Sequence, residues 1–97
     1  MAGARRRGTR TRQRDQPTLL QAAIFEIVDT QIRDGTPPAT RRTLERLVAS
    51  GYTRDEARRL IALVVLAEVH EVLAQQRPFD ERRLTAALER LPSLDLA

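Results

Sequence analysis

Apolar side chains recur every three to four residues in four stretches of the chain, which is the spacing of one face of an α-helix. The first stretch begins after Pro17-Thr18 and ends at Gly35, a residue suited to the left-handed position that follows a helix. The second begins by Ala39, because Pro37-Pro38 makes a stiff turn before it, and it stops at Ser50-Gly51. Both stretches predict amphipathic helices. In the second, the charged side chains lie mostly opposite the apolar ones; they are Arg41, Arg42, Glu45 and Arg46.

The third stretch carries the clearest local signal for a helix start. Thr53 is followed three residues later by Glu56, the pattern of a capping box in which each side chain satisfies a free backbone amide. Residues 61–67 that follow are all apolar. A helix that is apolar on every side is either central to a fold or half of an interface. Arg77-Pro78 ends this helix.

The fourth predicted helix begins at Phe79-Asp80, where Asp80 is the N-cap and Phe79 is placed to pack against the helix that follows. Pro92 ends it. The short connections favour antiparallel neighbours. We therefore expect an all-α fold, a small four-helix antiparallel bundle with short loops. The bundle spans residues 17–92, a disordered Arg-rich arm precedes it at residues 1–16, and a frayed tail follows at residues 93–97.

Length and composition argue against an enzyme. A chain of 97 residues buries one modest core and has little room for a large enclosed active site. The absence of cysteine excludes disulfides and thiolate metal sites. We find no phosphate-binding glycine loop, nucleophile elbow or zinc-ligand pair. The sequence therefore predicts a protein without catalytic residues, cofactor or metal.

The positive charge is concentrated at the N-terminus. All 17 basic residues are arginine, and six of them precede the first acidic residue: Arg5, Arg6, Arg7, Arg10, Arg12 and Arg14. The other 11 arginines are set against 13 acidic residues, so residues 15–97 carry a formal charge near −2. Such an arm is suited to sequence-independent contacts with the phosphates of RNA or DNA. The competing interpretation is a solvated tail with no partner.

The apolar pattern also bears on where the protein resides. The longest purely apolar run, residues 61–67, is too short to span a bilayer. The Arg-rich N-terminus is not followed by the continuous apolar segment of a secretory signal. We expect a cytoplasmic protein that does not contact a membrane.

Two of the polar residues that follow the apolar run of the third predicted helix bear on its role. Glu68 continues an apolar stripe and is therefore expected near the core, either bound to an arginine of a neighbouring helix or making a polar contact in a homodimer. His70 is expected to be a packed or rim residue. If this helix forms an interface, the stripe predicts its contacts: Ile61, Val65, Glu68 and Val72.

A second interpretation of the same region is a helix-turn-helix. Gly51-Tyr52-Thr53 would be the turn, and Arg54, Arg58 and Arg59 would lie on the recognition helix. A recognition helix must expose its surface to the DNA groove, whereas this one leads directly into an apolar segment that requires burial. DNA binding by this helix is the less favoured alternative.

Most of residues 17–92 resembles a bacterial family of small uncharacterised helical domains. The resemblance is carried by Val28-Asp29-Thr30-Gln31, Gly35-Thr36-Pro37-Pro38, Thr43-Leu44-Glu45-Arg46-Leu47, residues 51–57, Pro78-Phe79-Asp80 and Leu88-Glu89-Arg90-Leu91-Pro92. It implies a fold rather than an activity. Family members often carry histidines in the first helix and at the positions of Asp55 and Arg59, which implies a metal site for them; this sequence lacks those histidines.

Together these features predict a non-catalytic helical interaction module. It would dock a protein partner or self-associate, most simply as a homodimer, through surplus apolar surface on the third helix. The alternative is a nucleic-acid-binding accessory protein that uses the Arg-rich arm.

Overall fold

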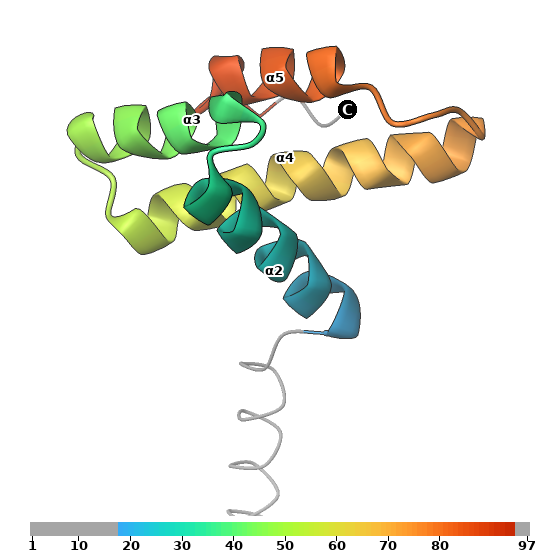
Figure 1. Cartoon of the computed structure of the whole chain (residues 1–97), viewed down its shortest axis with the longest axis horizontal. Helices are drawn as coiled ribbons and strands as arrows, with labels where there is room; N and C mark the ends of the chain where they lie inside the picture. Colours follow the sequence, from blue (N-terminus) through green and yellow to red (C-terminus); the bar gives the residue numbers. More distant parts are fainter. Residues whose placement is uncertain (1–17, 95–97) are drawn as a thin grey trace, which may run out of the picture.

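Four helices and no strand make up the described part of the chain, residues 18–94 of the computed structural model. With the labels of Figure 1 they are α2 (Leu19–Asp34), α3 (Pro38–Ala49), α4 (Arg54–Gln75) and α5 (Glu81–Arg90). They follow the four predicted stretches in order, so the predicted all-α, four-helix fold is confirmed. The arm expected at residues 1–16 and the end of the expected tail, residues 95–97, lie outside the described residues. No described helix combines the length and the apolar character needed to cross a membrane.

Local capping fixes where the helices begin and end. At the start of α4 the predicted capping box is present: Thr53 N–H donates to Glu56 Oε1 at 2.8 Å, and Glu56 N–H donates to Thr53 Oγ1 at 3.0 Å. Thr18 and Gln21 form the same reciprocal pair at the start of α2. Gly35 ends α2 with φ of 68°, a left-handed conformation that glycine adopts without strain.

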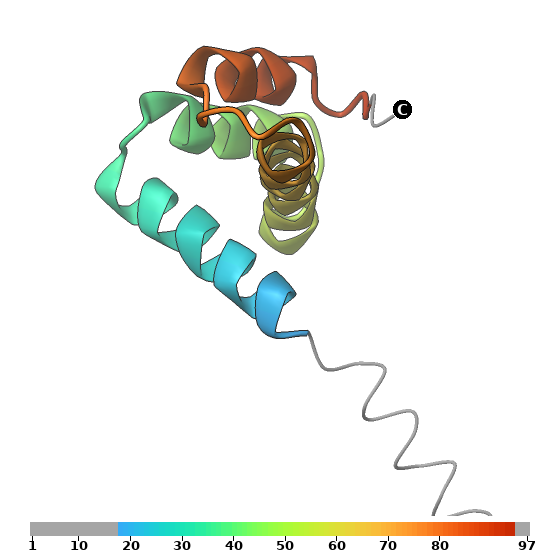
Figure 2. The same cartoon turned by 90° about the vertical axis from the view of Figure 1, so that its right-hand side faces the viewer.

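The longest helix, α4, is the centre of the arrangement and packs against each of the other three. α3 and α5 run antiparallel to α4 on one side, whereas α2 crosses α4 obliquely (Figure 1). Figure 2 looks along α4 and shows α2 on one side of it and the chain that follows α5 on the other. No further helix of residues 18–94 lies against the side of α4 that is turned away from α2.

A single core joins the four helices. Val28, Leu47, Ile61 and Leu88 are completely enclosed, one from each helix. Burying a side chain of this size stabilises the fold by about 1.5–3 kcal/mol relative to leaving it exposed. The full apolar core consists of Ile24, Val28, Ala39, Leu44, Leu47, Ala57, Ile61, Ala62, Val64, Val65, Leu84, Leu88 and Leu91.

Two arginines of α3 cap the C-terminal ends of the neighbouring helices. Arg41 Nε donates to the carbonyl of Ile32 in α2 at 2.8 Å. Arg46 Nη1 donates to the carbonyl of Leu91 at 2.8 Å, and its Nη2 donates to the carbonyl of Leu88 at 3.0 Å. The last carbonyls of a helix have no partner within the helix, and the C-terminal end attracts positive charge. α3 is therefore fixed to both α2 and α5 by hydrogen bonds as well as by apolar contact.

The Arg46 contacts predict a stability effect. In Arg46→Ala both capping bonds are lost, so we expect the free energy of unfolding of the full-length protein to fall by about 1–3 kcal/mol. Urea denaturation followed by circular dichroism measures this change. Arg42→Ala is the control, because Arg42 is exposed on the same helix and we expect a change below about 0.5 kcal/mol there. Equal effects of the two substitutions would contradict a capping role for Arg46.

Candidate functional site

Apolar side chains emerge on two opposite sides of α4, and only one side is buried by the other helices. On the inner side, Ile61 is completely enclosed and Val65 is 4% exposed. On the opposite side, Leu63 is 41% exposed and Leu73 is 73% exposed. Residues three or four positions apart lie on the same side of a helix. The residues on this exposed side, which we call the outer face of α4, are Leu63, Leu66, Ala67, His70 and Leu73. Its apolar surface is not enclosed by the four helices.

A groove of about 660 Å³ lies between this face and the end of α5. The outer face provides one wall, through Leu63 to His70. Ala87, Arg90 and Leu94 line it from α5 and the chain that follows. We call this the α4–α5 groove. It combines apolar walls with charged side chains, which is the usual composition of a site that binds a ligand in a fixed orientation.

An ion pair at the groove joins α4 to α5. Glu68 is only 7% exposed. Arg83 Nε donates to Glu68 Oε1 at 3.3 Å, and Arg83 Nη2 donates to Glu68 Oε2 at 3.2 Å. The hydrogen bond to Glu68 raises the pKa of Arg83 above its ordinary value. The prediction that Glu68 binds an arginine of a neighbouring helix is thus confirmed, and the pair holds the two walls of the groove together.

Two other guanidinium groups, those of Arg77 and Arg90, line the groove, and neither forms a side-chain hydrogen bond within residues 18–94. Arg77 Nη2 lies 4.0 Å from the nearer oxygen of Glu68 and 3.6 Å from an oxygen of Glu71. The Nε atom of Arg77 is buried and has no hydrogen-bond partner within residues 18–94. Arg90 makes no ion pair with any residue of the same described range. The groove therefore contains positive charge that its own carboxylates do not fully engage.

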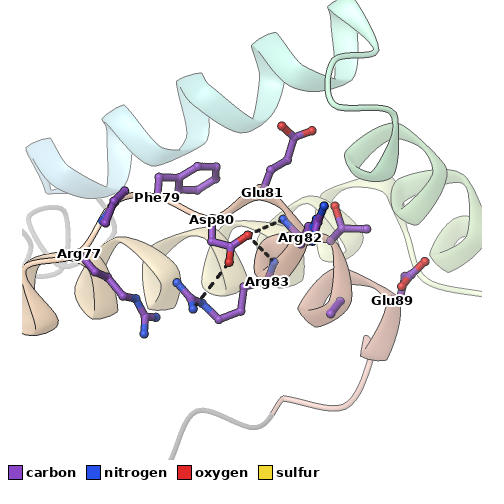
Figure 3. Close-up of a pocket in the computed structure, with 10 residues that line it drawn as sticks. Arg77, Phe79, Asp80, Glu81, Arg82, Arg83 and Glu89 are labelled. Carbon is purple, nitrogen blue, oxygen red and sulfur yellow. Dashed lines mark hydrogen bonds and ion pairs between the residues drawn. The ribbon is translucent and has the colours of Figure 1, made fainter.

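A second hollow, of about 770 Å³, lies beside the α4–α5 connection (Figure 3). Its central carboxylate is already occupied, because Asp80 Oδ1 accepts from the amides of Arg82 at 2.9 Å and Arg83 at 3.4 Å. Asp80 is thus the N-cap of α5, as predicted. Phe79 remains 52% exposed, so it packs only partly against its surroundings. The Asp80 carboxylate is therefore committed to the cap, and Glu81, Arg82 and Glu89 line the rest of this open hollow.

The residues predicted for an interface are mostly interior residues. Ile61, Val65 and Glu68 are buried within the bundle, and Val72 is partly buried. Ile61, Val65 and Glu68 fill the space between α4 and its neighbouring helices, whereas Val72 keeps some exposure. The more exposed apolar surface of the same helix is the outer face. The six N-terminal arginines predicted to contact nucleic acid lie outside the described residues.

His70 lies on the outer face and is exposed, so it is a surface residue rather than a core residue. Within residues 18–94, no group of three or more histidine, aspartate or glutamate side chains is placed to hold a metal ion. His70 therefore contributes a polar edge to the outer face.

Two of the three arginines of the helix-turn-helix alternative, Arg58 and Arg59, are engaged in contacts within the protein. Arg58 binds Asp29 of α2 through both carboxylate oxygens, at 2.7 and 2.9 Å, and its guanidinium lies 4.3 Å from the centre of the Phe25 ring. The bond from Arg58 lowers the pKa of Asp29. Arg59 lies 2.9 Å from Asp55. Arg58 therefore fastens α2 to α4, which argues against its use in reading DNA bases.

The outer face and the groove arginines were not predicted from the sequence. Leu63 and Leu66 lie within the same apolar run as Ile61 and Val65, so the pattern showed that the helix is apolar all round. It did not show which side the other helices cover. The sequence pattern did not single out Arg90 as a binding residue, because the helix dipole by itself explains why an arginine occurs near a helix C-terminus.

Comparisons of the chain with models of protein families, with curated proteins and with solved structures gave no match. The resemblance to a family of small bacterial helical domains therefore stays a prediction, as does the absence of enzyme activity. The case for function has to come from the site itself.

The Glu68–Arg83 pair leads to a second stability prediction. Glu68→Ala removes both hydrogen bonds and leaves a small cavity, so we expect a loss of about 1–3 kcal/mol in the free energy of unfolding. The loss stays in this range because the Arg83 side chain is 41% exposed and regains water. Glu71→Ala, an exposed site one turn later, is the control, with an expected change below about 0.5 kcal/mol. Thermal denaturation compares the two variants; an unchanged midpoint for Glu68→Ala would contradict this role.

Proposed function

We propose that this protein is a non-catalytic helical module that binds another polypeptide through the outer face of α4 and the α4–α5 groove. The observation that supports the proposal is the exposure of Leu63 and Leu73, at 41% and 73%, on a helix whose opposite side is the core. Clustered exposed apolar side chains with a polar rim are typical of protein interaction sites.

The shape of the site supports a helix as the bound element. A single exposed leucine is common on protein surfaces, but here Leu63 and Leu66 stand one turn apart and line the same groove as Leu94. Helix-in-groove recognition uses such apolar walls, because they accept side chains that repeat every three to four residues along a docked helix. Both a second copy of this chain and a foreign partner satisfy this geometry.

The first test substitutes the outer face without disturbing the core. In Leu63→Asp we expect loss of binding to a neutral, leucine-striped amphipathic helical peptide, and loss of any dimer seen by light scattering. Because Leu63 is 41% exposed and lies outside the core, we expect the free energy of unfolding to fall by only about 1–2 kcal/mol. The measurements are fluorescence anisotropy with the labelled peptide and the solution mass of the full-length protein.

Val48→Asp is the matched control, since Val48 is 43% exposed and lies on α3. It introduces the same charge at a similar exposure outside the groove, and we expect it to bind as the unsubstituted protein does. If the unsubstituted protein is monomeric and does not bind the peptide, or if both variants lose binding equally, the proposed function is wrong.

A second candidate function, nucleic-acid binding, is favoured by the charge distribution. Residues 18–94 contain 11 arginines and 11 acidic residues, so the surplus positive charge comes from the arginines of residues 5–14. Contacts from those arginines to phosphates would give affinity without sequence preference.

Deletion of residues 1–14 tests this second candidate. We expect the full-length protein to bind a mixed RNA and DNA pool at near-physiological salt, with a logarithmic salt slope of about −0.9 for each DNA phosphate contacted. We expect the shortened protein not to bind. Anisotropy of a labelled pool over a range of salt concentrations measures both, and equal binding by the two proteins would exclude the N-terminal arginines as the contact.

A further inference from the structure

We propose that the α4–α5 groove binds an acidic amphipathic helix of a partner protein. The apolar stripe of that helix would lie against Leu63 and Leu66, and its carboxylates would pair with Arg77 and Arg90. This inference rests on the proposed function and goes beyond it by stating the chemistry of the partner.

The length of the groove matches two turns of a docked helix. Its α4 wall extends from Leu63 to Glu71. At a rise of 1.5 Å per residue, these eight steps span about 12 Å. A docked helix presents apolar anchors at positions i, i+3 or i+4, and i+7, which span about 10.5 Å. Two consecutive turns of a partner helix therefore fit along this wall.

The charged side chains of the groove favour a docked helix with negative charge. Three guanidinium groups line it, and the buried carboxylate of Glu68 engages one of them, Arg83, through two hydrogen bonds. The Arg77 side chain is 31% exposed, and its Nη2 meets the nearest carboxylate oxygen in residues 18–94, that of Glu71, only at 3.6 Å. Arg90 is exposed and forms no ion pair within that range. Guanidinium groups with free donors bind carboxylates in paired hydrogen bonds, which favours glutamate or aspartate beside the apolar stripe.

Other occupants match the groove less well. No phenylalanine, tyrosine or tryptophan lines it, so single-stranded nucleic acid would find only the imidazole of His70 on which to stack its bases. Its phosphates would also leave the leucine walls uncovered. A second copy, docked face to face about a two-fold axis, would bring the same arginines from both molecules to one interface. The groove carries three guanidinium groups and only two carboxylates, those of Glu68 and Glu71, so positive charge would stay in excess.

The experiment uses three synthetic amphipathic helical peptides with the same leucine stripe. They differ only in the residue that flanks the stripe, which is glutamate, glutamine or lysine. Binding to the full-length protein is followed by fluorescence anisotropy at near-physiological salt. We expect the glutamate peptide to bind at least tenfold more tightly than the lysine peptide, with the glutamine peptide between them.

Charge reversal then locates the preference in the groove. Arg90→Glu should reduce the advantage of the glutamate peptide at least severalfold, and the combination with Arg77→Glu should abolish or reverse it. Arg42→Glu is the control: it changes net charge as Arg90→Glu does, but Arg42 lies on α3 and does not line the groove. The N-terminal arginines are present in every variant, so their attraction for acidic peptides is common to all. Circular dichroism confirms that the variants remain helical.

Each result decides for or against the acidic-helix proposal. A glutamate preference that Arg90→Glu weakens and Arg42→Glu leaves intact supports it. Equal binding of the three peptides, or equal effects of the two reversals, overturns it while leaving the proposed docking function in place. A dimer that Leu63→Asp dissociates, together with no binding of any peptide, overturns it in favour of a second copy. Displacement of a bound peptide by a single-stranded RNA of similar length, dependent on Arg90, overturns it in favour of nucleic acid.

Discussion

Burial of one side of α4 is the constraint on which the rest of the structure depends. α4 is apolar around most of its circumference, yet α2, α3 and α5 are shorter and pack against only part of it. Whichever side they cover, apolar groups remain on the other, because no further described helix is present to enclose them. The core and the outer face are therefore two consequences of one sequence feature. Inner residues such as Ile61 stabilise the fold, and outer residues such as Leu63 remain exposed for contacts with another molecule.

Arginine fixes the relative positions of the helices around α4. Arg41 and Arg46 hold α3 against the ends of α2 and α5, Arg58 holds α2 against α4, and Arg83 holds α5 against α4. A planar guanidinium with several donors can satisfy two acceptors at once, which an ammonium group does with less directional control. In a chain whose basic residues are all arginine, these bonds determine how the small apolar surfaces come together.

The same bonds shape the docking site. Because Glu68 binds Arg83, the first turn of α5 stays beside α4. Arg46 binds the carbonyls at the other end of α5, which carries the far wall of the α4–α5 groove. Glu68 binds one arginine of the groove, while the Arg77 and Arg90 side chains form no hydrogen bond within residues 18–94. A buried carboxylate that serves the fold thus also sets the charge that a partner meets. The structural and recognition roles of this cluster are linked through one side chain.

The sequence by itself determined the helices, because their signals are local: the capping box at Thr53 and Glu56, the glycine after α2 and the apolar spacing each act within a few residues. It also indicated that Glu68 would pair with an arginine, since a carboxylate in an apolar stripe requires a partner. Only the tertiary structure decided which side of α4 is buried, and it placed Ile61 and Val65 inside and Leu63 outside. It alone showed that Arg46 and Arg58 make contacts within the fold and that Arg77 and Arg90 share a groove. These outcomes depend on how helices distant in the sequence pack, and on an all-apolar helix the residue pattern is the same for either side.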